Sequence, residues 1–220
     1  LVNRYDSRRL RRITLAPKIP HAWSMDEVRL LLSAAKLMPG TLRCGVTASK
    51  LMHAWVLVGY ESALRPGDIR KLKPEDIGSD GVIRIVQSKT SHPHSCTLSS
   101  FAMKAIEPLM ASGQATLFPC SRNTVRRWEL RLFAQAKSMG FRKRIGQGLG
   151  TLRKTNATEV CRVEGLEAAA KSLGHVSGTR LARLHYVAPD AIATPSPPPA
   201  LFDGNRTPKS NQAGRRDRPR

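Results

Sequence analysis

Residues 48–64 predict a helix that is apolar on nearly every side, and this feature constrains the fold more than any other. Its large apolar residues are Leu51, Trp55, Val56, Leu57 and Val58. Because a helix without a polar face must be covered by other elements, we expect it to lie at the centre of a core. A chain of 220 residues is long enough for one sizeable domain with appendages.

The rest of the sequence predicts further helices around that segment and one pair of strands. Ser24-Met25-Asp26-Glu27 is a capping box, and it predicts a helix that Pro39-Gly40 ends. Helical patterns also cover residues 68–72, 101–110, 123–138, 151–163, 166–173 and 180–186. Residues 82–86 predict a strand, followed by a turn at 90–94 and a second strand at 95–98. The expected fold class is mainly α with a small antiparallel β-sheet, either a hairpin or three strands.

Composition divides the chain into three parts. Residues 1–20 predict a basic arm, 21–187 a folded domain, and 188–220 a disordered, Pro-rich basic tail. The longest apolar stretch is too short to cross a membrane. Four widely spaced cysteines (Cys44, Cys96, Cys120 and Cys161) form no CxxC motif, so we expect reduced thiols in a cytoplasmic protein and no structural zinc site. His92 and His94 lack a third ligand nearby, and we expect them in a solvated turn.

The charge of the chain points to a polyanionic partner. The net charge is +21, and residues 21–186 alone carry 25 Lys and Arg against 12 Asp and Glu, a net charge of +13. A folded body with such a field attracts nucleic-acid phosphates and binds them in a salt-dependent way. Charge alone fits a ribosomal-type basic protein equally well.

Five scattered polar residues are suited to cutting a phosphodiester bond without a metal ion: Arg65, Lys89, Arg153, His175 and Tyr186. A guanidinium grips phosphate oxygens bidentately. Lysine can give a proton to a leaving oxygen, histidine can hold or move one, and tyrosine is a possible nucleophile.

The segments around these residues resemble the catalytic domain of the tyrosine recombinases, the phage integrase family, from Ala22 to Val187. Ala63-Leu64-Arg65-Pro66-Gly67-Asp68 is similar to the first arginine box of the family, and Gln87-Ser88-Lys89-Thr90 is similar to its β-hairpin lysine. Leu152-Arg153-Lys154-Thr155 resembles the second arginine box, and Leu173-Gly174-His175 and His185-Tyr186-Val187 resemble the third box and the nucleophile. Order and spacing make the set specific, although each motif alone is weak.

This resemblance implies a role for each of the five residues and a partner for the chain. Tyr186 attacks the scissile phosphate, Arg65 and Arg153 stabilise its charge, Lys89 protonates the 5′-oxygen, and His175 assists the tyrosine. The chemistry needs neither a metal nor a cofactor. The implied partner is double-stranded DNA, on which the chain acts as a homo-oligomer in site-specific recombination. Asp68 is expected to support the site.

Two departures from the family pattern keep alternatives open. Gly150 stands where the second box has a histidine, and Tyr186 lies eleven residues after His175, further than in many members. We also expect the separate N-terminal DNA-binding domain of the family to be missing from this chain. A catalytically impaired DNA-binding remnant of an integrase is therefore one alternative, and a type IB topoisomerase, which shares the chemistry, is another.

Overall fold

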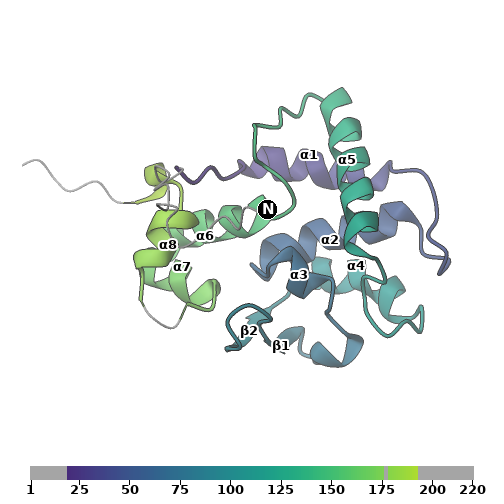
Figure 1. Ribbon diagram of the computed structural model, residues 1–220, viewed down its shortest axis with the longest axis horizontal. Coiled ribbons are helices and arrows are strands. Elements are labelled where there is room, and N and C mark those ends of the chain that lie inside the picture. The colour runs from purple at the N-terminus through teal and green to yellow at the C-terminus, as the bar shows by residue number, and fades with distance from the viewer. Residues whose placement is uncertain (1–18, 176–177, 193–220) are drawn as a thin grey trace, which may run out of the picture.

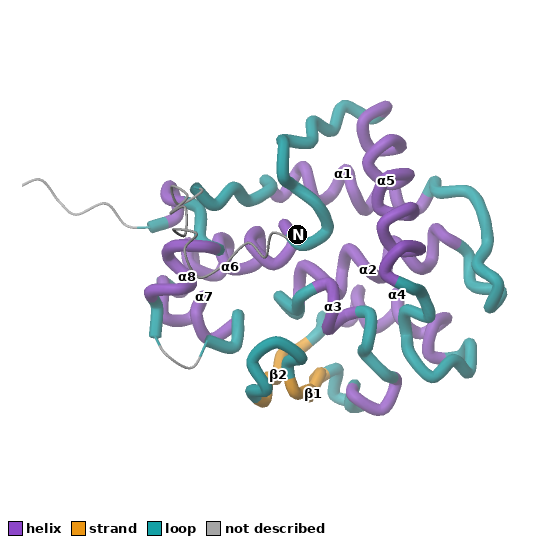
Figure 2. Tube along the Cα trace, in the orientation of Figure 1, coloured by secondary structure: helices purple, strands orange, loops and turns teal. Residues whose placement is uncertain are grey.

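The computed structural model describes residues 19–175 and 178–192 as a mainly helical protein with one β-hairpin (Figures 1 and 2). The longer helices are α1 (Met25–Lys36), α2 (Ala48–Glu61), α4 (Ser100–Met110), α5 (Arg122–Ser138) and α6 (Thr151–Glu164). Shorter ones are α3 (Pro66–Ile69), α7 (Leu166–Ser172), α8 (Arg180–His185), and the 3-10 turns η2 (Pro74–Asp76) and η3 (Pro189–Ala191). The expected fold class is confirmed.

Helix α2 lies at the centre of the main core, as its apolar sequence predicts. It packs against α1, α4, α5 and α6. Leu51, Met52 and Trp55 are fully buried, and the Trp55 ring meets the Phe118 ring edge-on at 4.9 Å between centroids. The helix ends at Glu61, three residues before the expected end, and this earlier end frees the backbone of Ala63 for the contact described below.

The start of the folded body is fixed by a cap and an aromatic cluster. Ser24 and Glu27 form the predicted capping box of α1. Trp23, directly before it, packs edge-on against Phe133 and Phe141 with centroids 5.9 and 5.8 Å away. These rings join the start of α1 to α5 and to the loop after α5.

The hairpin consists of β1 (Val82–Val86) and β2 (Pro93–Thr97), which pair antiparallel. The first strand has the bounds that the sequence predicts. The second begins two residues earlier, and its register places His94 opposite Ile85. His94 is therefore buried, and the expectation that it lies in a solvated turn is wrong; His92 is exposed as expected.

Helices α6, α7 and α8 form a second, smaller hydrophobic cluster beside the main core (Figure 1). Ala157, Leu173 and Val187 are among its fully buried members. Residues 188–192 are described, although the sequence assigns them to a disordered tail; they include η3 (Pro189–Ala191), which packs on α6. The predicted arm at 1–18 and most of the tail, 193–220, lie outside the described residues, so the domain limits stay a prediction.

No helix in the described part of the chain is long and apolar enough to span a membrane. Within residues 19–175 and 178–192, no cluster of three or more His, Cys, Asp or Glu side chains could hold a metal ion.

Candidate active site

Arg153 is a buried cation that ties two distant backbone segments together. It lies in the first turns of α6, and only 2% of its surface is exposed. Its Nη1 donates to the carbonyl of Ala63, and its Nη2 donates to the carbonyl of Leu173 at 2.8 Å. Ala63 has the left-handed φ of 50°, which is rare for a residue with a side chain and follows directly from the early end of α2. Burial lowers the pKa of Arg153 to about 10, so the guanidinium stays charged near neutral pH.

Tyr186 and His175 gather against this guanidinium. The Arg153 guanidinium carbon lies 5.0 Å from the centroid of the Tyr186 ring, within cation–π range. The His175 ring meets the same tyrosine edge-on, with centroids 5.3 Å apart. The structure thus brings three of the five candidate side chains into one contact cluster, although they come from three separate segments.

His175 has the electrostatics of a neutral imidazole. Burial, followed by the nearby charges of Arg153, Arg65 and His185, lowers the pKa of His175 to about 4. Its Nδ1 and the Nε of Arg153 are buried and have no hydrogen-bond partner among the described residues. A buried polar atom without a partner is unfavourable, so these two atoms favour a ligand that completes their hydrogen bonding.

Arg65 lies close enough to this cluster for its charge to help lower the pKa of His175. It is the residue directly before α3, and its side chain is 20% exposed. Its Nη1 donates to Oε1 of Gln87 at 2.6 Å and lies 4.0 Å from Oδ2 of Asp68. The other oxygen of Asp68 accepts from the backbone N–H of Ser88 at 3.0 Å. Asp68 therefore connects the arginine box to the hairpin.

Lys89 differs from the other four candidates because its side chain is exposed at the turn between β1 and β2. The structure holds the base of this turn, and not the lysine itself: Ser88 is bound to Asp68, and Gln87 is bound to Arg65. The hairpin thus carries Lys89 next to the first arginine box and leaves its side chain exposed to solvent.

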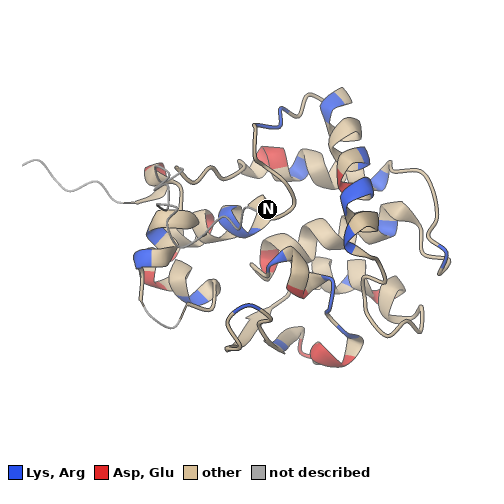
Figure 3. Ribbon diagram, viewed as in Figure 1, with Lys and Arg blue, Asp and Glu red and all other residues tan. Residues whose placement is uncertain are grey.

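Gly150 begins α6 at the edge of an open groove of about 700 Å³. The groove is lined by α3, the first half of α5 and residues 148–150. Its cations are Arg70, Arg122 and Arg126, and it also contains Glu129, which pairs with Arg126 at 2.7 Å. Figure 3 shows Lys and Arg along α5 and on the loop that follows it. A basic groove of this kind suits a phosphate backbone.

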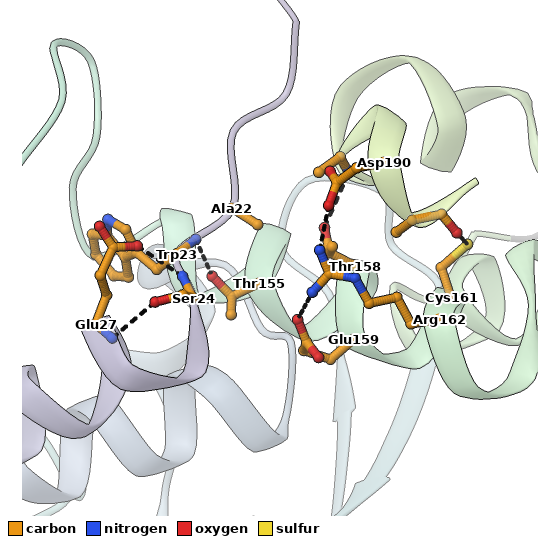
Figure 4. Close-up of polar contacts among 12 residues, drawn as sticks. Ala22, Trp23, Ser24, Glu27, Thr155, Thr158, Glu159, Cys161, Arg162 and Asp190 are labelled. Atoms are coloured by element: carbon orange, nitrogen blue, oxygen red, sulfur yellow. Dashed lines mark hydrogen bonds and ion pairs between the residues drawn. The ribbon is translucent and has the colours of Figure 1, made fainter. Parts of the chain in front are cut away.

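The chain directly after Tyr186 is fastened to α6 (Figure 4). The N–H of Ala188 donates to Oγ1 of Thr158 at 3.0 Å, and Arg162 pairs with both Glu159 and Asp190. Trp23 is held to the same helix through Thr155, whose Oγ1 accepts from its backbone N–H at 3.0 Å. The contacts of Ala188 and Asp190 hold the segment that follows the tyrosine against α6.

Sequence reasoning missed two buried members of the site, Gln87 and His94. Both pack against Gly174: a Cβ there would lie 2.7 Å from Nε2 of Gln87 and 2.8 Å from Nδ1 of His94. Gly174 also has φ of +66°, so both the backbone and the space require glycine. Gln87 lies within the lysine motif, which was the available signal, but its partners Arg65 and Leu173 are remote in sequence.

The family model described as the phage integrase family matches residues 24–191. Among solved structures, the chain is similar to XerA recombinase, with a TM-score of 0.62 and 22% identity over 80% of this chain and 64% of that one. It is also similar to XerH site-specific recombinase bound to a palindromic difH substrate (TM-score 0.59, 17% identity, 76% of this chain and 49% of that one). A lambda integrase dimer bound to a COC′ core site matches with a TM-score of 0.57 and 18% identity, over 77% and 49% of the two chains.

These likenesses concern the fold, because all three identities are below 25%. The chain spans between about half and two thirds of the length of these solved recombinases. No curated protein matches it significantly by sequence.

Proposed function

This chain belongs to the phage integrase family, and from that premise we propose that it is a tyrosine recombinase, which cuts and rejoins double-stranded DNA at a specific site. The observation that supports this most directly is the cluster of Arg153, His175 and Tyr186, with Arg65 beside it. It combines a nucleophile, a neutral imidazole and two cations around polar atoms that lack partners among the described residues.

In the proposed reaction, the phenolic oxygen of Tyr186 attacks the scissile phosphorus. A bond forms between that oxygen and phosphorus, and the bond from phosphorus to the 5′-oxygen breaks, leaving a 3′-phosphotyrosyl link. The tyrosine loses one proton and the 5′-oxygen gains one. Because one phosphodiester replaces another, the reverse attack by a 5′-hydroxyl rejoins a strand without an external energy source.

The two arginines would stabilise the charge that builds on the phosphate. Such preorganised electrostatic stabilisation is usually the largest single contribution to catalysis. Arg153 is suited to it because its two carbonyl contacts fix the guanidinium before DNA arrives, while its Nε has no partner in the described part of the chain. Arg65 has a partly exposed side chain and would meet the phosphate from the neighbouring segment.

His175 and Lys89 would handle protons on the two sides of the reaction. An unaided tyrosine has a pKa of about 10 and is a poor nucleophile at neutral pH. His175 is neutral because its pKa is lowered to about 4, so it has an acceptor nitrogen available for the tyrosine proton or a donor for the phosphate. Lys89, on its exposed turn, would protonate the leaving 5′-oxygen.

The proposed partner is duplex DNA, bound along the basic groove by Arg70, Arg122 and Arg126. Among the similar structures, lambda integrase is seen as a dimer on a core site and as a tetramer on a Holliday junction. By analogy, we propose that this chain acts as a homo-oligomer on DNA, because exchanging strands between two duplexes needs several active sites.

The proposal is tested by covalent capture from a pool of nicked duplexes with randomised sequence, so the target site can be unidentified at the start. A nick near the cut lets the released fragment diffuse away and leaves the protein linked to DNA. We expect the protein to form such adducts and Tyr186→Phe to form none while binding DNA as before. Tyr60→Phe, at a half-buried tyrosine on α2, is the matched control. Adducts formed by Tyr186→Phe would refute the assignment of the nucleophile.

A second candidate function is a DNA-binding remnant without cleavage activity. The absence of a side chain at Gly150, beside the groove, favours it. The same capture experiment separates the two functions, since a remnant binds the pool but yields no covalent adduct.

A further inference from the structure

Gln87 is a fully buried amide whose side chain makes three hydrogen bonds within the site. It directly follows β1, and none of its surface is exposed. Its Oε1 accepts from Nη1 of Arg65 at 2.6 Å and from the hydroxyl of Thr90 at 3.2 Å. Its Nε2 donates to the carbonyl of Leu173 at 3.3 Å. Donors on one side and an acceptor on the other fix the orientation of the amide.

The carbonyl of Leu173 is shared between Gln87 and Arg153. Arg153 donates to it at 2.8 Å, so this one oxygen joins Arg153 to the amide that holds Arg65. The same amide lies against Gly174, the residue before His175. Gln87 thus links the first arginine, the second arginine and the turn that carries the histidine.

We propose that Gln87 is a positioning residue that holds the Arg65 guanidinium in register with Arg153 and His175. The proposal rests on the function proposed above. A free arginine side chain explores many rotamers, and fixing it before substrate binds avoids that entropic penalty in the transition state. Unlike a carboxylate, a side-chain amide anchors the guanidinium without adding negative charge beside it, in addition to that of Asp68 4.0 Å away.

The hairpin itself does not need this side chain. Its turn is closed by backbone contacts, since the N–H of Gln87 donates to the carbonyl of His92 at 3.0 Å and the N–H of Ser91 donates back to the carbonyl of Gln87 at 2.9 Å. Asp68 also holds the N–H of Ser88. Removing the amide should therefore disturb Arg65 and leave the hairpin folded.

The first test compares Gln87→Met with Val86→Met. Methionine has a similar length but no amide, and Val86 is the adjacent, exposed position that receives the same side chain. We expect Gln87→Met to slow adduct formation by about 10²-fold, as for other losses of transition-state stabilisation, with DNA affinity within about threefold of the native value. Val86→Met should behave as the native protein. If Gln87→Met unfolds, the near-isosteric Gln87→Glu replaces it, because its carboxylate opposes the Leu173 carbonyl and pairs Arg65 away from the phosphate.

A substrate with sulfur in place of the scissile 5′-oxygen shows which partner Gln87 acts through. A thiolate leaves without being protonated, so this substrate should restore cleavage by Lys89→Ala, which lacks the proposed acid. It should not restore Gln87→Met, because Arg65 still has to grip the phosphate. Restoration of Gln87→Met by sulfur, or a native rate with the ordinary substrate, would overturn the proposal.

A measurement on the free protein separates this proposal from the proposed function. Burial and then the charges of Arg153, Arg65 and His185 lower the pKa of His175. If Gln87→Met releases Arg65 to solvent, the pKa of His175 measured by NMR should rise toward its ordinary value, and Val86→Met should leave it unchanged. If the native protein forms no adduct, the proposed function fails, and this titration alone decides about Gln87: an unchanged pKa in Gln87→Met would overturn the inference.

Discussion

Replacing Gly150 by histidine tests whether the departure from the family pattern limits catalysis. Gly150 has φ of −64° and ψ of −14°, ordinary helical angles that any residue adopts. A Cβ there would lie 3.7 and 3.9 Å from two ring carbons of Pro66, which is normal van der Waals contact. The new side chain would start beside the residue that follows Arg65, at the edge of the basic groove.

The expected changes in stability and in rate differ in size. Replacing glycine at a compatible backbone position stabilises a protein by about 0.4–1 kcal/mol through the unfolded chain. Glycine is favoured over most residues at a helix N-cap, so its loss there offsets a few tenths of a kcal/mol of this stabilisation. A new donor to the transition state contributes about 3 kcal/mol, and ordering the side chain costs up to about 1 kcal/mol, which leaves about 2 kcal/mol. That corresponds to about 30-fold faster cleavage.

Gly150→Ala is the matched control, since it makes the same backbone change without adding a donor. Both variants are compared by the rate of adduct formation on one captured duplex, after thermal unfolding has shown that their stabilities agree. If Gly150→His is as stable as Gly150→Ala but no faster, the missing histidine does not limit this site. Another residue then fills the role, or the chain is not a working recombinase.

Three further outcomes follow from the geometry. In Arg153→Lys a single nitrogen replaces the two that each serve one carbonyl, so the free energy of unfolding should fall by about 1–3 kcal/mol and cleavage by about 10²-fold; an unchanged free energy of unfolding in a denaturant titration would contradict the double anchor. Burial and nearby charges lower the pKa of His175 from 6.5 to about 4, so its contribution to stability is full above pH 6.5 and is lost as the pH falls toward 4. Burial also lowers the pKa of His94, so His175→Gln should reduce this pH dependence in urea titrations without abolishing it, and an equal slope would exclude His175 as a cause. DNA affinity should fall by orders of magnitude between about 50 and 200 mM salt, and a flat response in a binding titration would refute the basic groove as the DNA site.

Local signals predicted most of the fold. The capping box at Ser24 and Glu27 located α1, branched residues located β1, and the apolar segment located α2 at the centre. Each depends on residues close in sequence, where propensity and periodicity are informative. Likewise, the family motifs identified the segments that meet in the site.

The errors arise where a distant contact decides the local structure. The hydroxyl of Ser62 donates to the carbonyl of Val58 at 2.5 Å and accepts from the N–H of Leu64, which helps to end α2 early. Ala63 then turns its carbonyl to Arg153, 90 residues away. His94 is buried because the hairpin packs against Ser62 and Gly174. The contacts of Ser62 are local, but those of Ala63 with Arg153 and of His94 with Ser62 and Gly174 join residues that no short window of the sequence contains.

Arg153 shows how one residue can hold the fold and still be available for chemistry. A guanidinium has five N–H donors, and the two carbonyl contacts of Arg153 occupy one on each terminal nitrogen. Its Nε has no hydrogen-bond partner among the described residues, and in the proposed reaction the Nε and the second hydrogen of each terminal nitrogen would bind a phosphate. A lysine has three donors on one atom and no planar fork, so it cannot keep both carbonyls and also grip a phosphate bidentately. The fold and the proposed reaction therefore use different N–H groups of the same Arg153 side chain, and both require arginine at this position. Substituting Arg153 should therefore lower both the stability and the cleavage rate. Variants at Gln87 and Gly150 leave its two carbonyl contacts in place, so they should change cleavage separately from stability.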